Sequence, residues 1–473
     1  MNIPREHSPA SYREIMGIAF PLILSTSSLS LMHIIDRVFL SWYSPDALAA
    51  ALGAGATSLV FVSLPLGTAG YVSTFVSQYD GARRPERIGA ILWQGIYFSL
   101  IAGVVMALTA LGAEPFFRFV GHEAGVQRGE VDYFRVLVIG GSGPVLCAVL
   151  ASFYGGRGKT WLVMWVNVGA TLLNVVLDYC WIFGKAGFPE WGIFGAACAT
   201  VTATWMKVFI YLFCIFQAHH RAAFATLSAW RFDAPLFRRL LRFGLPSGLQ
   251  FMADVIAITL FVLFVGRIGR TELAASSIAF SINSIVFMPM IGMAMTTSVL
   301  VGRYLGADRP DDAARATRRA FGITAIYATV IAAVLVAWPE VFLAAFRPTD
   351  PEANFAAIAR TSCHLIYFIA AYSLADAVNI VYSAALKGAG DTRYVMWTLV
   401  TVASTVLITP LFVSAHFFGI NLYTAWVFLT GYVLVLASAY WLRYRTGRWR
   451  SMRVIEHGLS PEATLVDGPV IDT

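Results

Sequence analysis

Four carboxylate side chains lie deep inside long apolar stretches of the sequence, at Asp36, Asp178, Asp254 and Asp376. An ionised side chain at the centre of a lipid bilayer costs several kcal/mol, so each one needs a partner, water or a proton. Acids that bind and release a proton or a cation at such depth are typical of ion-coupled transport. Each acid also has a structural interpretation, as a residue wetted by headgroups or as a pair that holds helices together.

The first two acids are predicted to share a site. Asp36 lies about 10 Å past the midpoint of the stretch 15–43, and Asp178 lies at nearly the same depth in the stretch 161–183. Asn174 precedes Asp178 by four residues and projects from the same helix face. Two carboxylates close together in a poorly solvated place cannot both stay ionised, which favours a proton site. With the amide oxygen, they also resemble a hard-cation site for Na⁺.

Arg37 is the rival partner for Asp36, which it follows directly in the chain. Consecutive residues of a helix point about 100° apart. We therefore expect the long Arg37 side chain to reach outward to the headgroups instead of pairing with Asp36.

The second half of the chain carries its polar residues in another arrangement. Gln250 lies one turn before Asp254, and Asn379 lies about one turn after Asp376. Asn283 adds a further amide on the helix that follows Asp254. These residues are candidates for cation or substrate binding, although a lone buried Asp can also simply accept a hydrogen bond from a backbone or amide donor.

The apolar stretches that carry these residues are long enough to cross about 30 Å of hydrocarbon. The chain has 473 residues, of which 58% are hydrophobic and 13% charged, and its mean hydropathy is +0.69. We therefore predict an all-α integral membrane protein with twelve transmembrane helices, over residues 15–43, 46–79, 88–112, 130–154, 161–183, 193–217, 240–268, 272–302, 313–337, 355–386, 393–416 and 420–444.

An internal repeat organises these helices. Residues 79–85 (Tyr-Asp-Gly-Ala-Arg-Arg-Pro) recur 225 residues later as 304–310 (Tyr-Leu-Gly-Ala-Asp-Arg-Pro), and Pro21 recurs as Pro246. Six helices per repeat return the chain to its starting side, so the two repeats are parallel. We predict two six-helix lobes that form a V-shaped central cavity.

Most of the 34 Lys and Arg residues fall in the N-terminus, the even-to-odd loops and the C-terminal tail. This bias predicts that both termini are cytoplasmic. We expect a cytoplasmic N-terminus (1–14), an N-lobe (15–217), a cytoplasmic linker (218–239), a C-lobe (240–445) and a cytoplasmic tail, expected to be disordered (446–473).

Prolines inside predicted helices remove backbone hydrogen bonds and predict kinks at matched places in both halves. They are Pro21, Pro65, Pro246 and Pro289. Such kinks can be bending points between transport states or static curvature, and Pro21 is the strongest candidate for bending.

Several function classes are disfavoured. Residues 155–160 (Gly-Gly-Arg-Gly-Lys-Thr) look like a phosphate loop, but Phe153 occupies the leading glycine position. No catalytic motif and no nucleotide-binding domain is present, so we expect neither an enzyme nor a partner ATPase subunit. The net charge of +7 comes from loops beside apolar helices, which argues against nucleic acid. The cysteines lie inside apolar stretches without metal-ligand spacing, and no cofactor is expected.

The chain resembles the multidrug and toxic compound extrusion (MATE) family, and most closely its bacterial NorM-type or DinF-type branches. The resemblance covers all twelve helices. It rests on Asp36, Asn174-Val175-Val176-Leu177-Asp178, Pro189, Gly195-Ala196-Ala197-Cys198-Ala199-Thr200 and Lys387-Gly388-Ala389-Gly390-Asp391-Thr392.

The resemblance implies a secondary transporter of the bacterial inner membrane that exchanges inward H⁺ or Na⁺ for export of cationic, amphipathic compounds. It implies that Asp36, Asn174, Asp178 and Thr200 form the N-lobe ion site and that Pro21 is the bending point. We expect a monomer in contact only with membrane lipid and its small substrates.

Asp254 and Asp376 match acidic positions that the family associates with the C-lobe. The NorM branch more often has Glu in helix 7, so the shorter Asp254 leaves the role of the C-lobe and the identity of the ion open. A flippase for lipid-linked precursors is the nearest alternative, and it should have a cavity lined by cations. A non-transporting scaffold or receptor is the second, and it would have no need for four buried acids.

Overall fold

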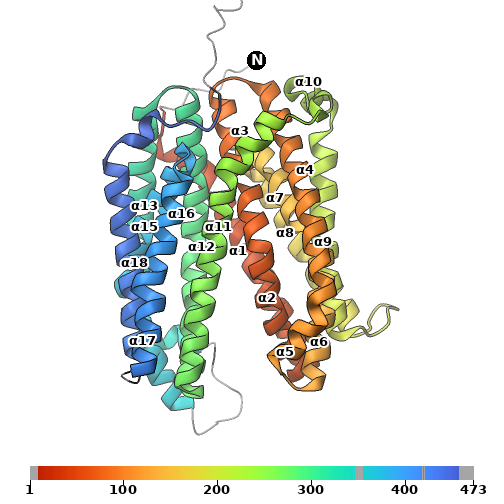
Figure 1. Cartoon of the computed structure of the whole chain (residues 1–473), viewed down its shortest axis with the longest axis vertical. Coiled ribbons are helices and arrows are strands. Elements are labelled where there is room, and N and C mark those ends of the chain that lie inside the picture. Colours follow the sequence, from red (N-terminus) through yellow and green to blue (C-terminus); the bar gives the residue numbers. More distant parts are fainter. Residues whose placement is uncertain (1–8, 345, 347–354, 418, 420, 457–473) are drawn as a thin grey trace, which may run out of the picture.

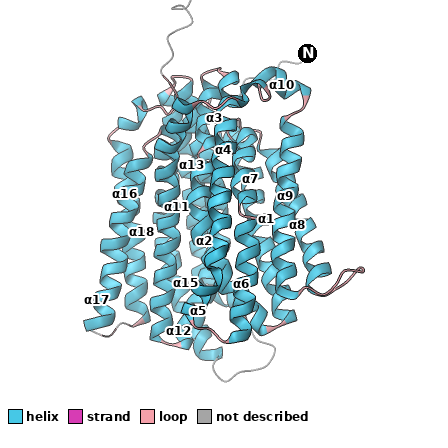
Figure 2. Cartoon of the chain, turned by 45° about the vertical axis from the view of Figure 1, so that its right-hand side comes forward, coloured by secondary structure: helices cyan, strands magenta, loops and turns pink. Residues whose placement is uncertain are grey.

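The structure is a computed structural model that describes residues 9–344, 346, 355–417, 419 and 421–456. Within these ranges every regular element is a helix (Figure 2). In that part of the chain, 12 helical segments are long and apolar enough to cross a membrane. The predicted all-α membrane fold is therefore confirmed.

The first six spans form the N-lobe, in which spans 2, 3 and 4 are each built from more than one helix. Its elements are α1 (Tyr12–Tyr43), α2 (Pro45–Gly70), α3 (Val72–Gly81), α4 (Pro85–Thr109), η1 (Ala110–Gly112), α5 (Ala113–Val120), α6 (Ala124–Ile139), α7 (Ser142–Gly155), α8 (Thr160–Ile182) and α9 (Gly192–Ile215).

The last six spans form the C-lobe, and one π-helical stretch, η3, interrupts span 11. The linker and C-lobe elements are α10 (Ala218–Phe224), η2 (Ser228–Trp230), α11 (Ala234–Ile268), α12 (Arg270–Gly306), α13 (Pro310–Ala337), α14 (Pro339–Ala344), α15 (Phe355–Ala389), α16 (Thr392–Val402), η3 (Ala403–Ile408), α17 (Thr409–Phe417), α18 (Leu422–Arg445) and η4 (Arg448–Ser451).

The first C-lobe helix begins earlier than predicted, at Ala234 instead of residue 240. The Asp233 side chain caps α11 by accepting a hydrogen bond of 3.0 Å from the Leu236 amide. Pro235 occupies the first turn, where its missing N–H costs nothing. The linker between the lobes is therefore shorter than the predicted 218–239.

The two lobes meet at the face that carries both ends of the described chain, which we call the terminal face (Figure 1). There the Tyr304 hydroxyl accepts from the Ala10 amide and donates to Glu14, both at 2.7 Å. The Tyr71 hydroxyl donates to the Lys387 carbonyl at 2.7 Å. These bonds join spans 1 and 2 to spans 8 and 10.

Away from the terminal face the lobes diverge toward what we call the open face (Figure 1). The hydroxyl of Thr26, near the middle of α1, donates to the Met288 carbonyl at 3.3 Å. Among the described residues, no inter-lobe hydrogen bond or ion pair lies closer to the open face than this one. This distribution of contacts produces the predicted V shape.

Glycines allow the lobes to approach closely, and they do so symmetrically. Gly81 packs against the backbone of Arg303, and Gly306 packs against the backbone of Gln78. Under the 225-residue repeat, these two contacts are copies of each other. A methyl group at either glycine would overlap the facing carbonyl.

The base of the first helix of each repeat packs into the core of the opposite lobe. Ile15, Ala19 and Leu22 of α1 belong to the same buried cluster as the C-lobe core. Leu236 and Leu240 of α11 belong to the buried cluster of the N-lobe. We call this arrangement cross-packing.

The start of the C-terminal tail is ordered, contrary to the expectation for 446–473. Residues 446–456 pack onto the terminal face, because Trp449 (2% exposed) and Val454 (0%) bury their side chains there. The remaining residues, 457–473, lie outside the described part of the chain.

We call residues 446–456 the C-terminal strap, because it leaves the C-lobe and attaches to the N-lobe. The Val454 amide donates to Gln78 Oε1 at 2.8 Å. Glu456 accepts from the Tyr79 hydroxyl and from Arg87, both at 2.8 Å.

Candidate functional site

Helices α1 and α8 are held side by side by polar bonds along their length. Asn167 donates to the Ser25 hydroxyl at 2.7 Å, and the Thr171 hydroxyl donates to the Ser28 carbonyl at 3.3 Å. About two turns further toward the open face, this register brings Asp36 opposite Asp178.

Asp36 and Asp178 form a buried carboxyl pair. Asp36 is 5% exposed and Asp178 is 0% exposed. Their side chains lie close enough for the charge of each to act on the other. Two ionised carboxylates repel each other in a poorly solvated place, which favours a proton on one of them.

The two other predicted members of the N-lobe site lie beside this pair. Thr200 of α9 is within reach of Asp36, and Asn174 is within reach of Asp178. Among the described residues, however, no hydrogen bond of ordinary geometry satisfies the Thr200 hydroxyl, either amide atom of Asn174 or either oxygen of Asp178. Asp36 Oδ1 is also without a partner. Buried polar atoms are nearly always paired in proteins, so these side chains are candidates to bind water, an ion or another ligand.

The donor atoms fit a small hard cation or protons. They are carboxylate, amide and hydroxyl oxygens, the ligand types that hard cations prefer. The described residues contain no group of three or more His, Cys, Asp or Glu side chains placed to hold a metal ion. With only two acids, the site suits Na⁺ or H⁺ better than a divalent metal.

The structure adds two residues that we did not predict from the sequence. His33 Nδ1 lies 3.9 Å from Asp36 Oδ2, and its side chain is 56% exposed. Tyr133 of α6 is buried, and it lies near enough to Asp36 and Asp178 for their charges to act on it. The three-residue spacing of His33 and Asp36 could have signalled the first. Nothing in the local sequence could have signalled the second, because only the tertiary packing brings α6 to the site.

Arg37 does not pair with the site. It is exposed, and no ion pair to Asp36 is present among the described side chains. Pro21 lies inside α1, next to Leu22 of the cross-packed base, and the Asp36 end of the helix lies on α8. Pro21 therefore lies within the part of α1 that packs in the C-lobe, on the terminal-face side of Asp36.

The C-lobe acids have partners. Asp254 of α11 accepts a hydrogen bond of 3.1 Å from the Tyr432 hydroxyl of α18. Lys387 of α15 lies near enough to Asp254 for the two charges to attract each other, although the two side chains form no direct ion pair. Asp254 is therefore partly compensated inside the lobe.

The remaining predicted C-lobe residues do not form one tight cluster with Asp254. Asp376 is 7% exposed, is within reach of Asn379 one turn away and interacts with the charge of Asp254. Gln250 and Asn283 are half-buried, and no side-chain hydrogen bond involving either is found in the described structure.

Comparison with known proteins identifies the family of the chain. The MatE family model matches residues 21–180 and 246–413. A probable multidrug resistance protein NorM of Thermotoga maritima is 24% identical over 457 residues, which cover 96% of each chain. The multidrug resistance protein NorM of Burkholderia vietnamiensis is 28% identical and covers 80% of this chain and 82% of its own.

Solved structures share the fold at lower identity. An outward-facing multidrug resistance MATE transporter of the MOP superfamily has a TM-score of 0.85 at 20% identity, covering 93% of this chain and 96% of that one. A MOP superfamily transporter from Pyrococcus furiosus, described as having a binding pocket of reverse polarity that suggests a different function, has a TM-score of 0.84 at 21% identity. It covers 94% of this chain and 98% of that one.

Proposed function

This chain belongs to the MatE family of multidrug efflux transporters, and on that premise we propose that it exports cationic amphipathic compounds in exchange for inward H⁺ or Na⁺. The members of this family are transporters and not enzymes. The observation that carries the proposal is the group of buried, unpaired oxygens around Asp36 and Asp178.

The proposed ion site works through charge. With no ion bound, Asp36 and Asp178 hold negative charge in a place with little solvent, which is unfavourable and attracts a cation. A bound ion supplies the missing positive charge. Asn174 and Thr200 can orient around either a proton or Na⁺, because an amide and a hydroxyl group can each present an oxygen to a cation.

Loading of the site is proposed to change the shape of α1. The helix is held at its base by the C-lobe core and at Asp36 by α8. Pro21 lacks the N–H that would complete the helix at this junction, so bending there costs less than elsewhere. A bend at Pro21 would move the Asp36 end of α1 and reduce the space for substrate in the N-lobe.

The terminal face is proposed to be cytoplasmic. Arg-rich segments flank the spans there, as they do on the inner side of membrane proteins. With that orientation, the inter-lobe bonds close the cytoplasmic side and the described conformation faces outward. Each chain holds both lobes, so we propose that it works as a monomer.

The acidic polarity of the lobes supports a cationic substrate. The intramembrane acids outnumber the lysines Lys207 and Lys387, whereas a flippase for diphosphate-linked lipids would need several cations. Export of one monovalent cation against about 100 mV costs about 2.3 kcal/mol, which one inward proton or Na⁺ offsets. The ion gradient then provides the net driving force.

The test is dye efflux from proteoliposomes under separately imposed proton and sodium gradients. We expect one of the two gradients to drive efflux of a cationic dye and Asp36→Asn to abolish that response. Asp132→Asn, an exposed acid of the same lobe, is the matched control and should behave like the wild type. Full gradient-driven efflux by Asp36→Asn would contradict the proposed site.

A further inference from the structure

A third carboxylate of the N-lobe, Glu130 of α6, is buried and only half satisfied. It is 1% exposed, and its Oε2 has no hydrogen-bond partner among the described residues. Gly53 of α2 leaves the space that the carboxylate occupies, because a methyl group there would overlap Glu130 Oε1. A buried carboxylate that keeps one free oxygen is costly unless it binds something.

The partner of Glu130 connects it to the aqueous phase. His122 Nδ1 lies 3.0 Å from Glu130 Oε1, and the His122 side chain is 50% exposed. His122 stands in the loop between α5 and α6, at the open face. The pair therefore reaches from solvent into the protein, and imidazole is the side chain best suited to exchange protons near neutral pH.

The same helix leads from Glu130 to the ion site. Tyr133 lies three residues after Glu130, about 4.5 Å deeper along the helix axis. It is buried and interacts with the charges of Asp36 and Asp178. Exposure thus falls from His122 to Glu130, and Tyr133 follows on the same helix, near the carboxyl pair.

We propose that the His122–Glu130 pair is the proton-loading site that supplies Asp36 and Asp178 from the open face. His122 takes a proton from water and passes it to the Glu130 carboxylate, which then hands it inward. The Tyr133 hydroxyl accepts this proton as it donates its own to the carboxyl pair, so each relay group returns to its starting form. The inference rests on the proposed function and specifies H⁺ as the ion that uses this route.

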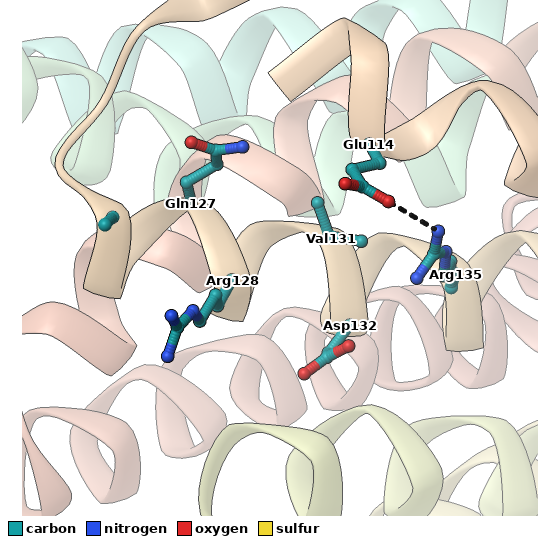
Figure 3. A pocket seen from close by; sticks show the side chains of 7 residues that line it. Glu114, Gln127, Arg128, Val131, Asp132 and Arg135 are labelled. Atoms are coloured by element: carbon teal, nitrogen blue, oxygen red, sulfur yellow. Dashed lines mark ion pairs between the residues drawn. The ribbon is translucent and has the colours of Figure 1, made fainter. Parts of the chain in front are cut away.

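The other charged groups around α6 do not take the place of His122. Residues of α5 and α6 line a hollow of about 330 Å³. Arg135 lies 3.8 Å from Glu114 there, and Figure 3 marks this ion pair. The lining of the hollow excludes Glu130. Besides Glu130, the charged groups on α6 and on the elements packed against it are Asp46, Glu86, Arg87, Glu114, Arg118, Arg128, Asp132, Arg135 and Lys207, and α1 adds Asp36 and Arg37. In the described structure none of them forms an ion pair or hydrogen bond with Glu130.

The decisive variant is Glu130→Gln, because glutamine keeps the size and a hydrogen bond to His122 but cannot carry the proton. We expect proton-driven dye efflux at about pH 8 outside to fall about tenfold or more, in line with the loss of a proton-transfer group. At about pH 6 the difference should narrow, because protons are abundant enough to reach the carboxyl pair without a relay. Equilibrium dye binding should not change. His122→Gln should show the same pattern with a smaller loss.

Two controls separate this inference from its premise. Glu123→Gln changes an exposed acid of the same loop and should match the wild type at both pH values. Asp36→Asn should lose proton-driven efflux at both. If it does so while Glu130→Gln transports normally, the loading site is wrong and the coupling site stands. If Asp36→Asn transports normally, the proposed function itself fails.

A purely structural role for Glu130 predicts another result. If Glu130 only anchors the loop before α6 to α2, Glu130→Gln should lower thermal stability and reduce efflux equally at both pH values. That outcome would overturn the proposal. An efflux loss that depends on external pH, with unchanged stability, supports it.

Discussion

Both lobes carry acids inside their membrane spans, yet they treat them differently. In the N-lobe, Asp36 and Asp178 lie together with oxygens that no described residue satisfies. In the C-lobe, Asp254 accepts a hydrogen bond from Tyr432 and lies near Lys387. One frame thus carries an incomplete polar cluster on one side and a compensated one on the other. The difference teaches that repeated architecture does not imply repeated chemistry.

The largest effect should come from removing both N-lobe acids. Asp36→Asn and Asp178→Asn should each reduce gradient-driven efflux by about 100-fold, and the double variant should be no worse, because the pair acts as a unit. Initial rates of dye efflux from proteoliposomes measure this. Additive losses would mean that the two acids work separately and would break the comparison.

Close packing at the terminal face should be equally sensitive in both lobes. Gly81→Ala and Gly306→Ala each force a methyl group against a facing backbone, and each should destabilise the protein by about 1–3 kcal/mol. Thermal unfolding of the purified protein is the measurement. Gly322→Ala, with nothing within 4 Å, is the control and should be neutral or slightly stabilising. Very different losses of stability in Gly81→Ala and Gly306→Ala would show that the two symmetric contacts do not contribute equally to stability.

The C-lobe acid should matter less for coupling. Asp254→Asn keeps an oxygen that can accept from Tyr432, so we expect efflux to change by a few-fold at most and to remain gradient-dependent. Tyr432→Phe removes the donor and should cost about 1–3 kcal/mol of stability. If Asp254→Asn instead uncouples efflux from the gradient as completely as Asp36→Asn, both lobes drive transport.

The smallest effect concerns the C-terminal strap. Burial alone would raise the pKa of Glu456, but hydrogen bonds from its own backbone amide, Tyr79 and Arg87 lower it below its usual range. The stabilisation from this lowered pKa is present above the unfolded-state pKa of about 4.3 and is lost as pH falls through the lower folded value.

Glu456→Gln should therefore weaken the strap at neutral pH by at most about 1 kcal/mol, because the pair is partly exposed. Hydrogen exchange of residues 448–456 is the measurement. The variant should exchange faster than the wild type at neutral pH and at the same rate in acid. A difference that persists in acid would show that the charge of Glu456 is not the cause.

The fold was largely predictable, because the lengths of the apolar stretches and the recurring residues can be identified directly in the sequence. The depth of Asp36 and Asp178 was predictable for the same reason, and the packing of α1 on α8 brings the two residues near each other. Tyr133 was not, because its role depends on how α6 packs. The predicted helix began at residue 130, which placed Glu130 at a helix end. In the structure α6 begins at Ala124, so Glu130 lies in the middle of a helix and is buried.

The strap was missed because its few apolar residues, Trp449, Val454 and Ile455, are too short a run to show a helix or strand period. Their burial becomes evident only in the structure, where they pack onto the terminal face. The role of Thr200 came from family resemblance and not from the sequence pattern itself.

Cross-packing has a mechanical meaning. Ile15 and Leu22 of α1 are anchored in the other lobe, while the end of α1 that carries Asp36 packs on α8. A rotation of one lobe against the other would therefore strain α1 between these two anchors. A peptide cut in the linker should therefore leave two fragments that co-purify, since each holds part of the other's core.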